Sequence, residues 1–133
     1  MYKSINNLDV SVPTQKTLVT RNLKNISVEV AQILAEWKGD TLILHDMETI
    51  SVEAAQALSK WQGQWLSIYG LNNISAEAAQ ALAGWKGYFL VLNSLNTLPA
   101  KVAQALLNWQ GIRLHLYNLT SLSQEASIEL IKW

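Results

Sequence analysis

The sequence predicts an α/β fold in the form of a right-handed solenoid, and this prediction rests on a repeated pattern. Nearly the same residues recur every 24 positions, in the copies 23–46, 47–70, 71–94 and 95–118 and in a partial copy at 119–133. Five of the six Trp share one position of this period, namely Trp37, Trp61, Trp85, Trp109 and Trp133. Four of the six Gly lie two residues after a Trp, namely Gly39, Gly63, Gly87 and Gly111. A fixed period of this length is typical of solenoids, in which each unit covers the apolar face of its neighbour.

Composition excludes several classes of protein and site. The chain has 133 residues, enough for one domain with an apolar core, and half of them are hydrophobic, which excludes intrinsic disorder. Ten basic residues balance ten acidic ones, so no net charge attracts nucleic acid or an anionic membrane. There is no cysteine, hence no disulfide and no thiolate metal site. The apolar runs are too short to span a membrane, and residues 1–7 lack the apolar core of a signal peptide, so the compartment stays open.

The first 17 residues fall outside the repeat, and we interpret residues 1–17 as an N-terminal cap. Pro13 and Gln15 stand where the Trp and Gly of the period would be. Leu8, Val10 and Val12 alternate with polar residues, as in a strand. Because the end of a solenoid otherwise exposes its core, we expect this segment to cover the first unit of a solenoid that spans 18–133.

Each unit is predicted to begin with a short strand. Residues 42–44, 66–68, 90–92 and 114–116 have apolar first and third positions, and residues 18–20 align with them. A period of two predicts a strand with one buried face. Since a helix is expected between successive strands, neighbouring strands should be parallel and their crossovers right-handed.

A helix of about three turns is predicted after each strand. A serine precedes three of these helices and can accept hydrogen bonds from their first amides, namely Ser27, Ser51 and Ser75. A Glu two positions later suits the positive end of the helix dipole. In the fourth unit Pro99 replaces the serine, and we expect Thr97 or Leu98 to be the cap.

The inward side of the helices is predicted from helical spacing. In the second unit the apolar stripe consists of Ala54, Ala55, Leu58 and Trp61. Alanine allows the helix to lie close to the strands, and Trp closes the far end of the layer. We expect Gly63 to adopt a left-handed conformation that ends the helix and turns the chain into the next strand.

The spacing of Leu66, Ile68, Leu71 and Ile74, repeated in the other units, resembles that of leucine-rich repeats, and is most similar to bacterial variants rich in Leu, Ser and Ala. The resemblance covers residues 18–133 and implies a horseshoe with parallel strands on its concave face and helices on its convex face. The family often carries Asn in the bend, where this chain has Leu or Met. We expect a nearby polar column to satisfy the backbone of the bend, namely Asn25, Thr49, Asn73, Thr97 and Ser121.

The units differ most at the strand positions that point away from the helices. Variation on one exposed face above a faithfully repeated scaffold is typical of a binding surface. Trp65 is the one Trp outside the repeated column, and Tyr69 and Phe89 are its expected neighbours. Exposed aromatic residues beside Arg are typical interface anchors, although the rings could also serve only to cover the sheet. The predicted ligand-binding residues are Trp65, Tyr69, Phe89, Arg113, Tyr117, His45 and His115.

The sequence predicts no catalytic, cofactor or metal chemistry. The outward strand positions contain no Asp or Glu, which leaves only His for acid–base work. His45 and His115 are three units apart, roughly 14 Å at about 4.8 Å per strand, too far to share a metal ion. No phosphate-binding loop, nucleophile elbow or zinc spacing occurs. Arg21 and Arg113 are too few and too far apart to favour nucleic acid.

We therefore expect a non-catalytic repeat scaffold that binds a protein or peptide on its concave face. Five strands at about 4.8 Å give a face roughly 20 Å across, which favours a peptide segment. Two alternatives stay open. The aromatic patch could bind a glycan or another small ligand, or the chain could be a structural module that self-associates. Self-association would use the last predicted strand, 113–117, because Trp133 is followed by neither the Gly nor the strand of the period.

Overall fold

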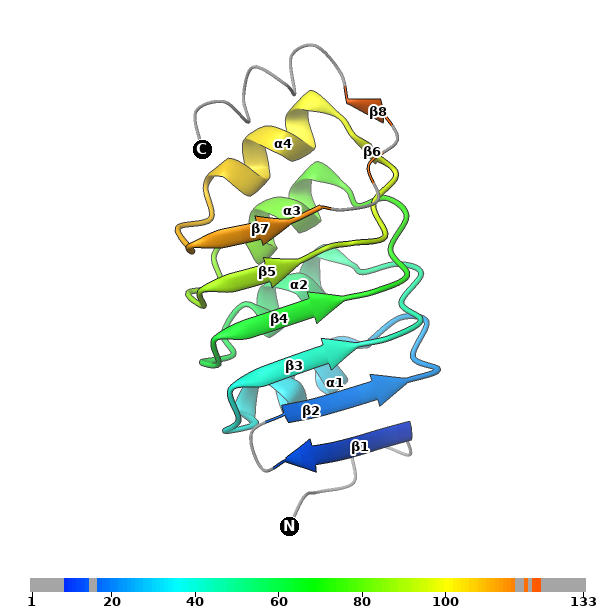
Figure 1. The fold of residues 1–133 in the computed structure, drawn as a ribbon, viewed down its shortest axis with the longest axis vertical. Helices are drawn as coiled ribbons and strands as arrows, with labels where there is room; N and C mark the ends of the chain where they lie inside the picture. Colours follow the sequence, from blue (N-terminus) through cyan, green and yellow to red (C-terminus); the bar gives the residue numbers. More distant parts are fainter. Residues whose placement is uncertain (1–8, 15–16, 117–118, 120, 123–133) are drawn as a thin grey trace.

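The computed structural model describes residues 9–14, 17–116, 119 and 121–122, in which strands and helices alternate (Figure 1). The elements are β1 (Asp9–Thr14), β2 (Thr17–Arg21), α1 (Val28–Glu36), β3 (Thr41–Leu44), α2 (Val52–Leu58), β4 (Trp65–Ile68), α3 (Ala76–Leu82), β5 (Phe89–Val91), β6 (Thr97–Leu98), α4 (Ala100–Leu107), β7 (Arg113–His115) and β8 (Ser121–Leu122). The predicted α/β class is confirmed.

Six of the strands form one sheet in the order β1-β2-β3-β4-β5-β7. From β2 to β7 all neighbours are parallel, as predicted, and each residue is paired with the residue 24 positions later, for example Trp65 with Phe89 and Phe89 with Arg113. The 24-residue period of the sequence therefore equals the offset between paired residues on neighbouring strands. The four helices lie side by side against one face of this sheet (Figure 1). We call the opposite face, which no described helix covers, the open face.

The two remaining strand pairings lie outside this parallel array. β1 pairs antiparallel with β2, with Val10 opposite Thr20, and so occupies the edge of β2 that faces away from β3. A strand in the region interpreted as a cap thus pairs with the backbone edge of the first unit. β6, which directly precedes the N-cap of α4, pairs in parallel with β8, with Thr97 opposite Ser121.

The core lies between the sheet and the helices. Leu42, Leu66 and Leu90 point into it from adjacent strands, and the predicted helix stripe of Ala54, Ala55, Leu58 and Trp61 is buried there. Burial of these apolar side chains on one face of each strand follows from the period-two pattern. Short alanine side chains on the inward face of α2 and α3 let both helices approach the strands closely.

The predicted serine caps are confirmed. Ser27, Ser51 and Ser75 accept from the amides of the residues three positions later, at 3.1, 3.1 and 3.0 Å. The predicted cap of the fourth helix is wrong, because Pro99 itself is the N-cap residue of α4 and makes no side-chain hydrogen bond there. Thr97 and Leu98 belong to β6 instead.

The repeated Trp residues stack in a continuous column. The ring centroids of Trp37, Trp61, Trp85 and Trp109 are 6.0, 5.8 and 6.0 Å apart in succession, with interplanar angles of 14°, 5° and 1°. Trp133 lies outside the described residues. The prediction that Gly63 is left-handed is wrong. An added Cβ at Gly63 would overlap the ring of Trp61, and the other three glycines that follow a Trp have the same relation to their own ring. Glycine is present because the indole lies over it.

Left-handed conformations occur instead at the end of the strands. Asn22 and Asp46 have φ of 60° and 66°, and Gly70 has φ of 104°. The Asp46 carboxylate accepts from the Asn22 amide at 2.8 Å, and the Ser94 hydroxyl accepts from the Gly70 amide at 2.7 Å, so each side chain bonds the bend of the preceding unit. The described side chains of the Asn73 column are exposed, and the backbone amides of Asn22 and Gly70 are bonded by Asp46 and Ser94 instead, so the role expected for this column stays a prediction.

Candidate binding surface

The open face carries two groups of rings in contact. In the first, the Trp65 ring lies 5.0 Å from the ring of Phe89 and 6.2 Å from that of His115, measured between centroids. In the second, the rings of His45 and Tyr69 stack at 5.0 Å with an interplanar angle of 13°. Strand register explains both groups, because Trp65 is paired with Phe89 across adjacent strands, and His45 and Tyr69 follow β3 and β4 at equivalent positions.

Trp65 is fixed by polar as well as aromatic contacts. Its indole Nε1 donates to the Ser67 hydroxyl at 2.8 Å, so the ring lies along its own strand. Ser67 and Val91 lie on this face as well, yet they are only 1% and 4% exposed. Both point away from the helices, but they are covered by the neighbouring side chains. The rings therefore do cover the sheet, while Trp65 itself remains 38% exposed.

The other predicted site residues are distributed over the same face. Arg113 is exposed at the start of β7, in register with Phe89. His45, Tyr69, Phe89 and His115 are partly buried. Tyr117 lies outside the described residues. The structure thus brings Trp65, Phe89 and His115 into one cluster, with Arg113 beside it, and places His45 and Tyr69 in a separate pair.

Two exposed apolar residues next to this cluster were missed from the sequence. Tyr88 is 48% exposed and Ile112 is 69% exposed, each directly before a strand. They are neighbours, because the Ile112 amide donates to the Tyr88 carbonyl at 2.8 Å. Their column reads Asp40, Gln64, Tyr88, Ile112 along the chain. The change from polar to apolar residues along this column could have indicated an exposed apolar surface.

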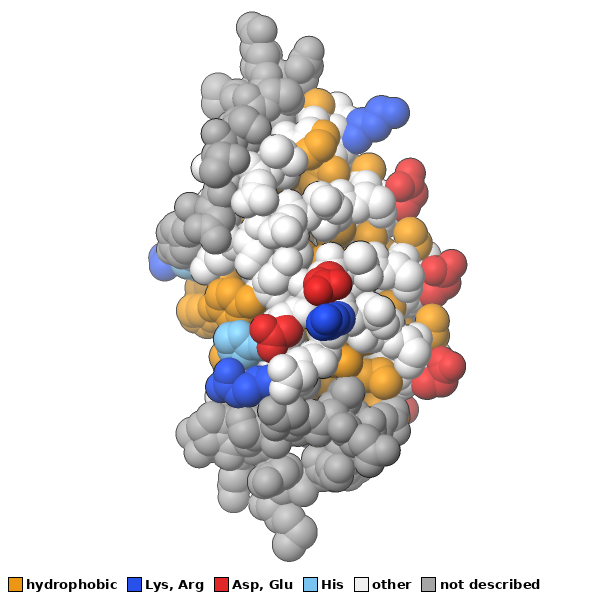
Figure 2. All heavy atoms as spheres, turned by 90° about the vertical axis from the view of Figure 1, so that its right-hand side faces the viewer, with side chains coloured by type: hydrophobic (Ala, Val, Ile, Leu, Met, Phe, Trp, Pro, Cys, Tyr) orange, Lys and Arg blue, Asp and Glu red, His pale blue; other side chains and the backbone are white. Residues whose placement is uncertain are grey.

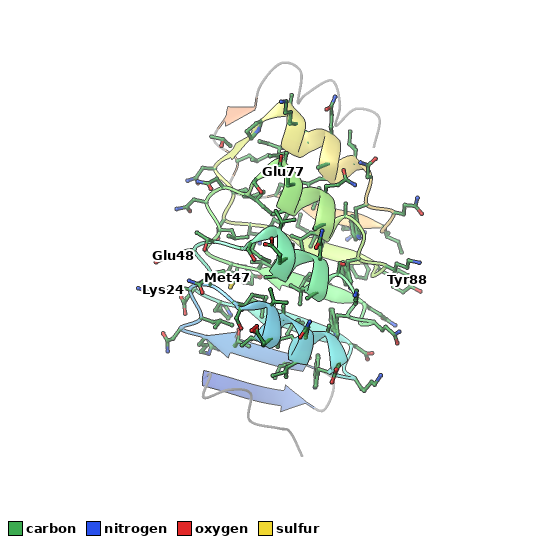
Figure 3. All side chains as sticks on the ribbon, turned by 180° about the vertical axis from the view of Figure 1, so that it is seen from behind. Lys24, Met47, Glu48, Glu77 and Tyr88 are labelled. Atoms are coloured by element: carbon green, nitrogen blue, oxygen red, sulfur yellow. The ribbon has the colours of Figure 1, made fainter. Side chains whose placement is uncertain are left out.

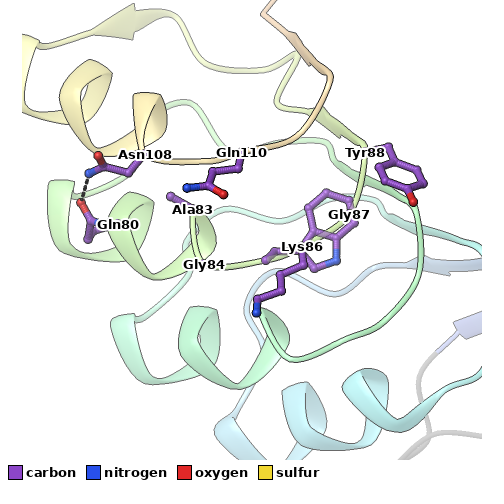
Figure 4. A pocket seen from close by; sticks show the side chains of 9 residues that line it. Gln80, Ala83, Gly84, Lys86, Gly87, Tyr88, Asn108 and Gln110 are labelled. Carbon is purple, nitrogen blue, oxygen red and sulfur yellow. Dashed lines mark hydrogen bonds between the residues drawn. The ribbon is translucent and has the colours of Figure 1, made fainter.

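A cavity of about 510 Å³ opens beside Tyr88, between the ends of α3 and α4 and the loop that leads into β5 (Figure 4). Polar and apolar residues share its lining. The Asn108 amide nitrogen donates to the Gln80 side-chain oxygen at 2.8 Å, while Lys86 and Tyr88 line the loop side. The cavity is therefore lined by amide groups, one cation and the aromatic residues Trp85 and Tyr88.

Charged side chains lie at both edges of the sheet, and acidic and basic residues occur at each. The edge where the strands end and the helices begin carries exposed carboxylates, among them Glu48 and Glu77, and several acidic side chains are visible there in Figure 2. Lys24 and Glu48 lie at this edge, 3.9 Å apart and solvent-exposed, whereas Tyr88 lies at the opposite one (Figure 3). Acidic residues at helix N-termini suit the helix dipole.

Within the described part of the chain, no group of three or more His, Cys, Asp or Glu is placed to hold a metal ion. No described helix is long and apolar enough to cross a bilayer. The described side chains of the open face include no carboxylate.

The chain matches no protein-family model, and neither a curated protein nor a solved structure is significantly similar to it.

Proposed function

We propose that the chain is a solenoid of the leucine-rich-repeat type and that its open face binds a peptide segment of a partner protein. The parallel register of 24 residues, with helices on one face only, supports the repeat architecture. The observation that carries the binding proposal is the state of Trp65, which is partly exposed yet held by Ser67 and in contact with two other rings, those of Phe89 and His115.

A ring held in this way is well suited to be an interface anchor. Trp is among the residues that most often dominate binding energy. Because the Trp65 side chain is already ordered by its hydrogen bond and ring contacts, a ligand loses little conformational entropy of the protein when it binds there. The open face is formed by the parallel strands β2, β3, β4, β5 and β7, and an extended peptide can lie across such a row of strands.

Non-catalytic binding is supported by the chemistry of the face. Acid–base catalysis needs a titratable group near the reacting atoms, and the described open face supplies only His45 and His115, in separate ring groups. Glycan binding on the same rings and self-association of the chain stay predictions, and the experiment below separates them from peptide binding.

The test is selection of random 12-residue peptides displayed on phage against the immobilised protein, followed by affinity measurement with the selected synthetic peptides. The variant is Trp65→Ser/Phe89→Ser, verified as folded by circular dichroism. The matched control is Gln56→Ser, an exposed substitution on α2. We expect the double variant to lose at least about thirtyfold in affinity, equivalent to about 2 kcal/mol for an anchor residue, and the control to bind normally.

Three results would contradict the proposal. Equal affinity of the double variant and the native protein would place binding elsewhere. Failure to select any peptide, combined with binding of soluble oligosaccharides, would favour the glycan alternative. A mass that rises with protein concentration, with no peptide selected, would favour self-association.

A further inference from the structure

The edge of the sheet at which the strands begin carries an exposed apolar surface of its own. We call residues 59–65, 83–89 and 108–113 the strand-start edge. Tyr88 and Ile112 lie next to each other on it, and they are two of the four large hydrophobic residues that are exposed in the described part of the chain. Packing against other described residues leaves about half of the Tyr88 side chain and more than half of Ile112 in water.

This apolar surface is continuous with the open face. Phe89 follows Tyr88 directly and contacts Trp65, and Arg113 follows Ile112 directly. Tyr88 also lines the cavity on the other side of the edge, together with Lys86 (Figure 4). The exposed apolar surface therefore extends from the open face, around the strand-start edge, to the cavity near the ends of α3 and α4.

The charges around Tyr88 and Ile112 have one sign. The charged residues of these three ranges are Lys60, Lys86 and Arg113, all exposed, and the ranges contain no Asp or Glu. The equivalent stretch of the first unit, 35–41, is mixed, because it contains Glu36 and Asp40 beside Lys38. The helix dipole accounts for Lys60 and Lys86, which follow α2 and α3, but not for Arg113, which begins a strand.

We propose that the peptide bound at Trp65 continues over Tyr88 and Ile112, and that this part of the partner is an acidic segment with interspersed apolar side chains. The inference rests on the proposed function. Apolar side chains of the partner would cover Tyr88 and Ile112, and its carboxylates would face Lys86 and Arg113. Complementary charge at the rim of an interface mainly accelerates association and rejects partners of the wrong sign.

The test uses the peptides selected on the native protein and a second selection on the charge-reversed variant Lys86→Glu/Arg113→Glu. We expect peptides from the native protein to carry net negative charge and those from the variant to lose it. Acidic peptides should bind the variant about tenfold more weakly, and their affinity for the native protein should fall with added salt. Lys24→Glu/Lys101→Glu, which reverses two charges at the opposite edge, is the control and should leave binding unchanged.

A second pair of variants tests the apolar contact. Ile112→Ser should weaken binding about tenfold if the peptide covers this side chain. Ile33→Ser is the matched control, because Ile33 is likewise exposed but lies on α1. Both variants replace an exposed residue, so loss of folding does not confuse the comparison.

The outcomes separate this inference from the proposed function. Neutral or basic peptides that depend on Trp65 and Phe89 but ignore Ile112 and the charge reversal would overturn the inference alone. Peptides that depend on Ile112 but bind Trp65→Ser/Phe89→Ser normally would overturn the proposed function. Selection of no peptide would overturn both.

Discussion

Replacing Gly87 with alanine should destabilise the chain far more than the single added methyl group suggests. The new Cβ would overlap the six-membered ring of Trp85. That ring is 1% exposed and stacked between Trp61 and Trp109, with centroids 5.8 and 6.0 Å away, so its movement along the column is restricted. Overpacking of a tight core typically costs about 1–3 kcal/mol, and expulsion of the indole would raise the loss towards about 3–5 kcal/mol.

Gly84 provides the matched control. It lies three residues earlier and is exposed, and an added Cβ there would have the Ala81 carbonyl oxygen as its nearest atom, at 3.3 Å. Because Gly84 does not have a positive φ, Gly84→Ala should change stability by no more than about 1 kcal/mol, in the stabilising direction if the unfolded chain loses entropy.

Urea denaturation of both variants, followed by far-ultraviolet circular dichroism, measures the difference in the free energy of unfolding. For a domain of this size the expected loss in Gly87→Ala corresponds to a fall in Tm of about 3–5 °C per kcal/mol. Equal unfolding midpoints for Gly87→Ala and Gly84→Ala would refute the reasoning, because the ring would then not restrict the residue beneath it.

Two further predictions concern the helix caps and the bends. Ser75→Ala should cost about 1 kcal/mol of unfolding free energy, because the Ala78 amide loses its 3.0 Å hydrogen bond, and a urea titration that shows no loss would contradict the cap. Asp46→Ala should cost about 1–3 kcal/mol, because it removes the acceptor of the Asn22 amide and places alanine at a φ of 66°. Asp46→Gly should recover the backbone part of this loss, and exposed Asn73→Ala should change stability by less than about 0.5 kcal/mol in the same assay.

The fold was predictable where one residue type has one physical explanation at its position. Alternating apolar residues fixed the strands, and Ser51 or Ser75 before an alanine-rich stretch marked the helix starts, because a hydroxyl there has a clear hydrogen-bonding role. Gly63 was misinterpreted because a left-handed cap and an overlying ring both require glycine, and only the coordinates separate the two causes.

The left-handed conformation after the strands was predictable from the residue types at one repeat position. Asn22, Asp46 and Gly70 occupy one repeat position, and Asn, Asp and Gly are the residues that most readily accept a left-handed backbone. The hydrogen bonds from Asp46 and Ser94 to the preceding unit could not be predicted in the same way, because they depend on which amide lies opposite each side chain.

The sequence predicted the face of the sheet on which the candidate site lies, but not the side-chain conformations within the site. Strand alternation placed Trp65 and Phe89 on the side away from the helices. It could not show that the Trp65 ring would bend along its strand to Ser67 and shield it, because that depends on side-chain rotamers. Tyr88 was not predicted because it lies immediately before β5, and strand alternation applies only within the strand.

The contact between each Trp and the Gly two residues later has a consequence for how such a chain can lengthen. Both partners lie within one 24-residue unit, so a duplication copies the ring together with the residue that makes room for it. A duplicated unit therefore already contains the glycine that its own Trp ring requires. Point substitutions at either residue lack this advantage, since a lone change at Gly87 leaves Trp85 without space, and a lone change at Trp85 leaves a void between two stacked rings. Change by whole units is thus easier for this architecture than change at single residues.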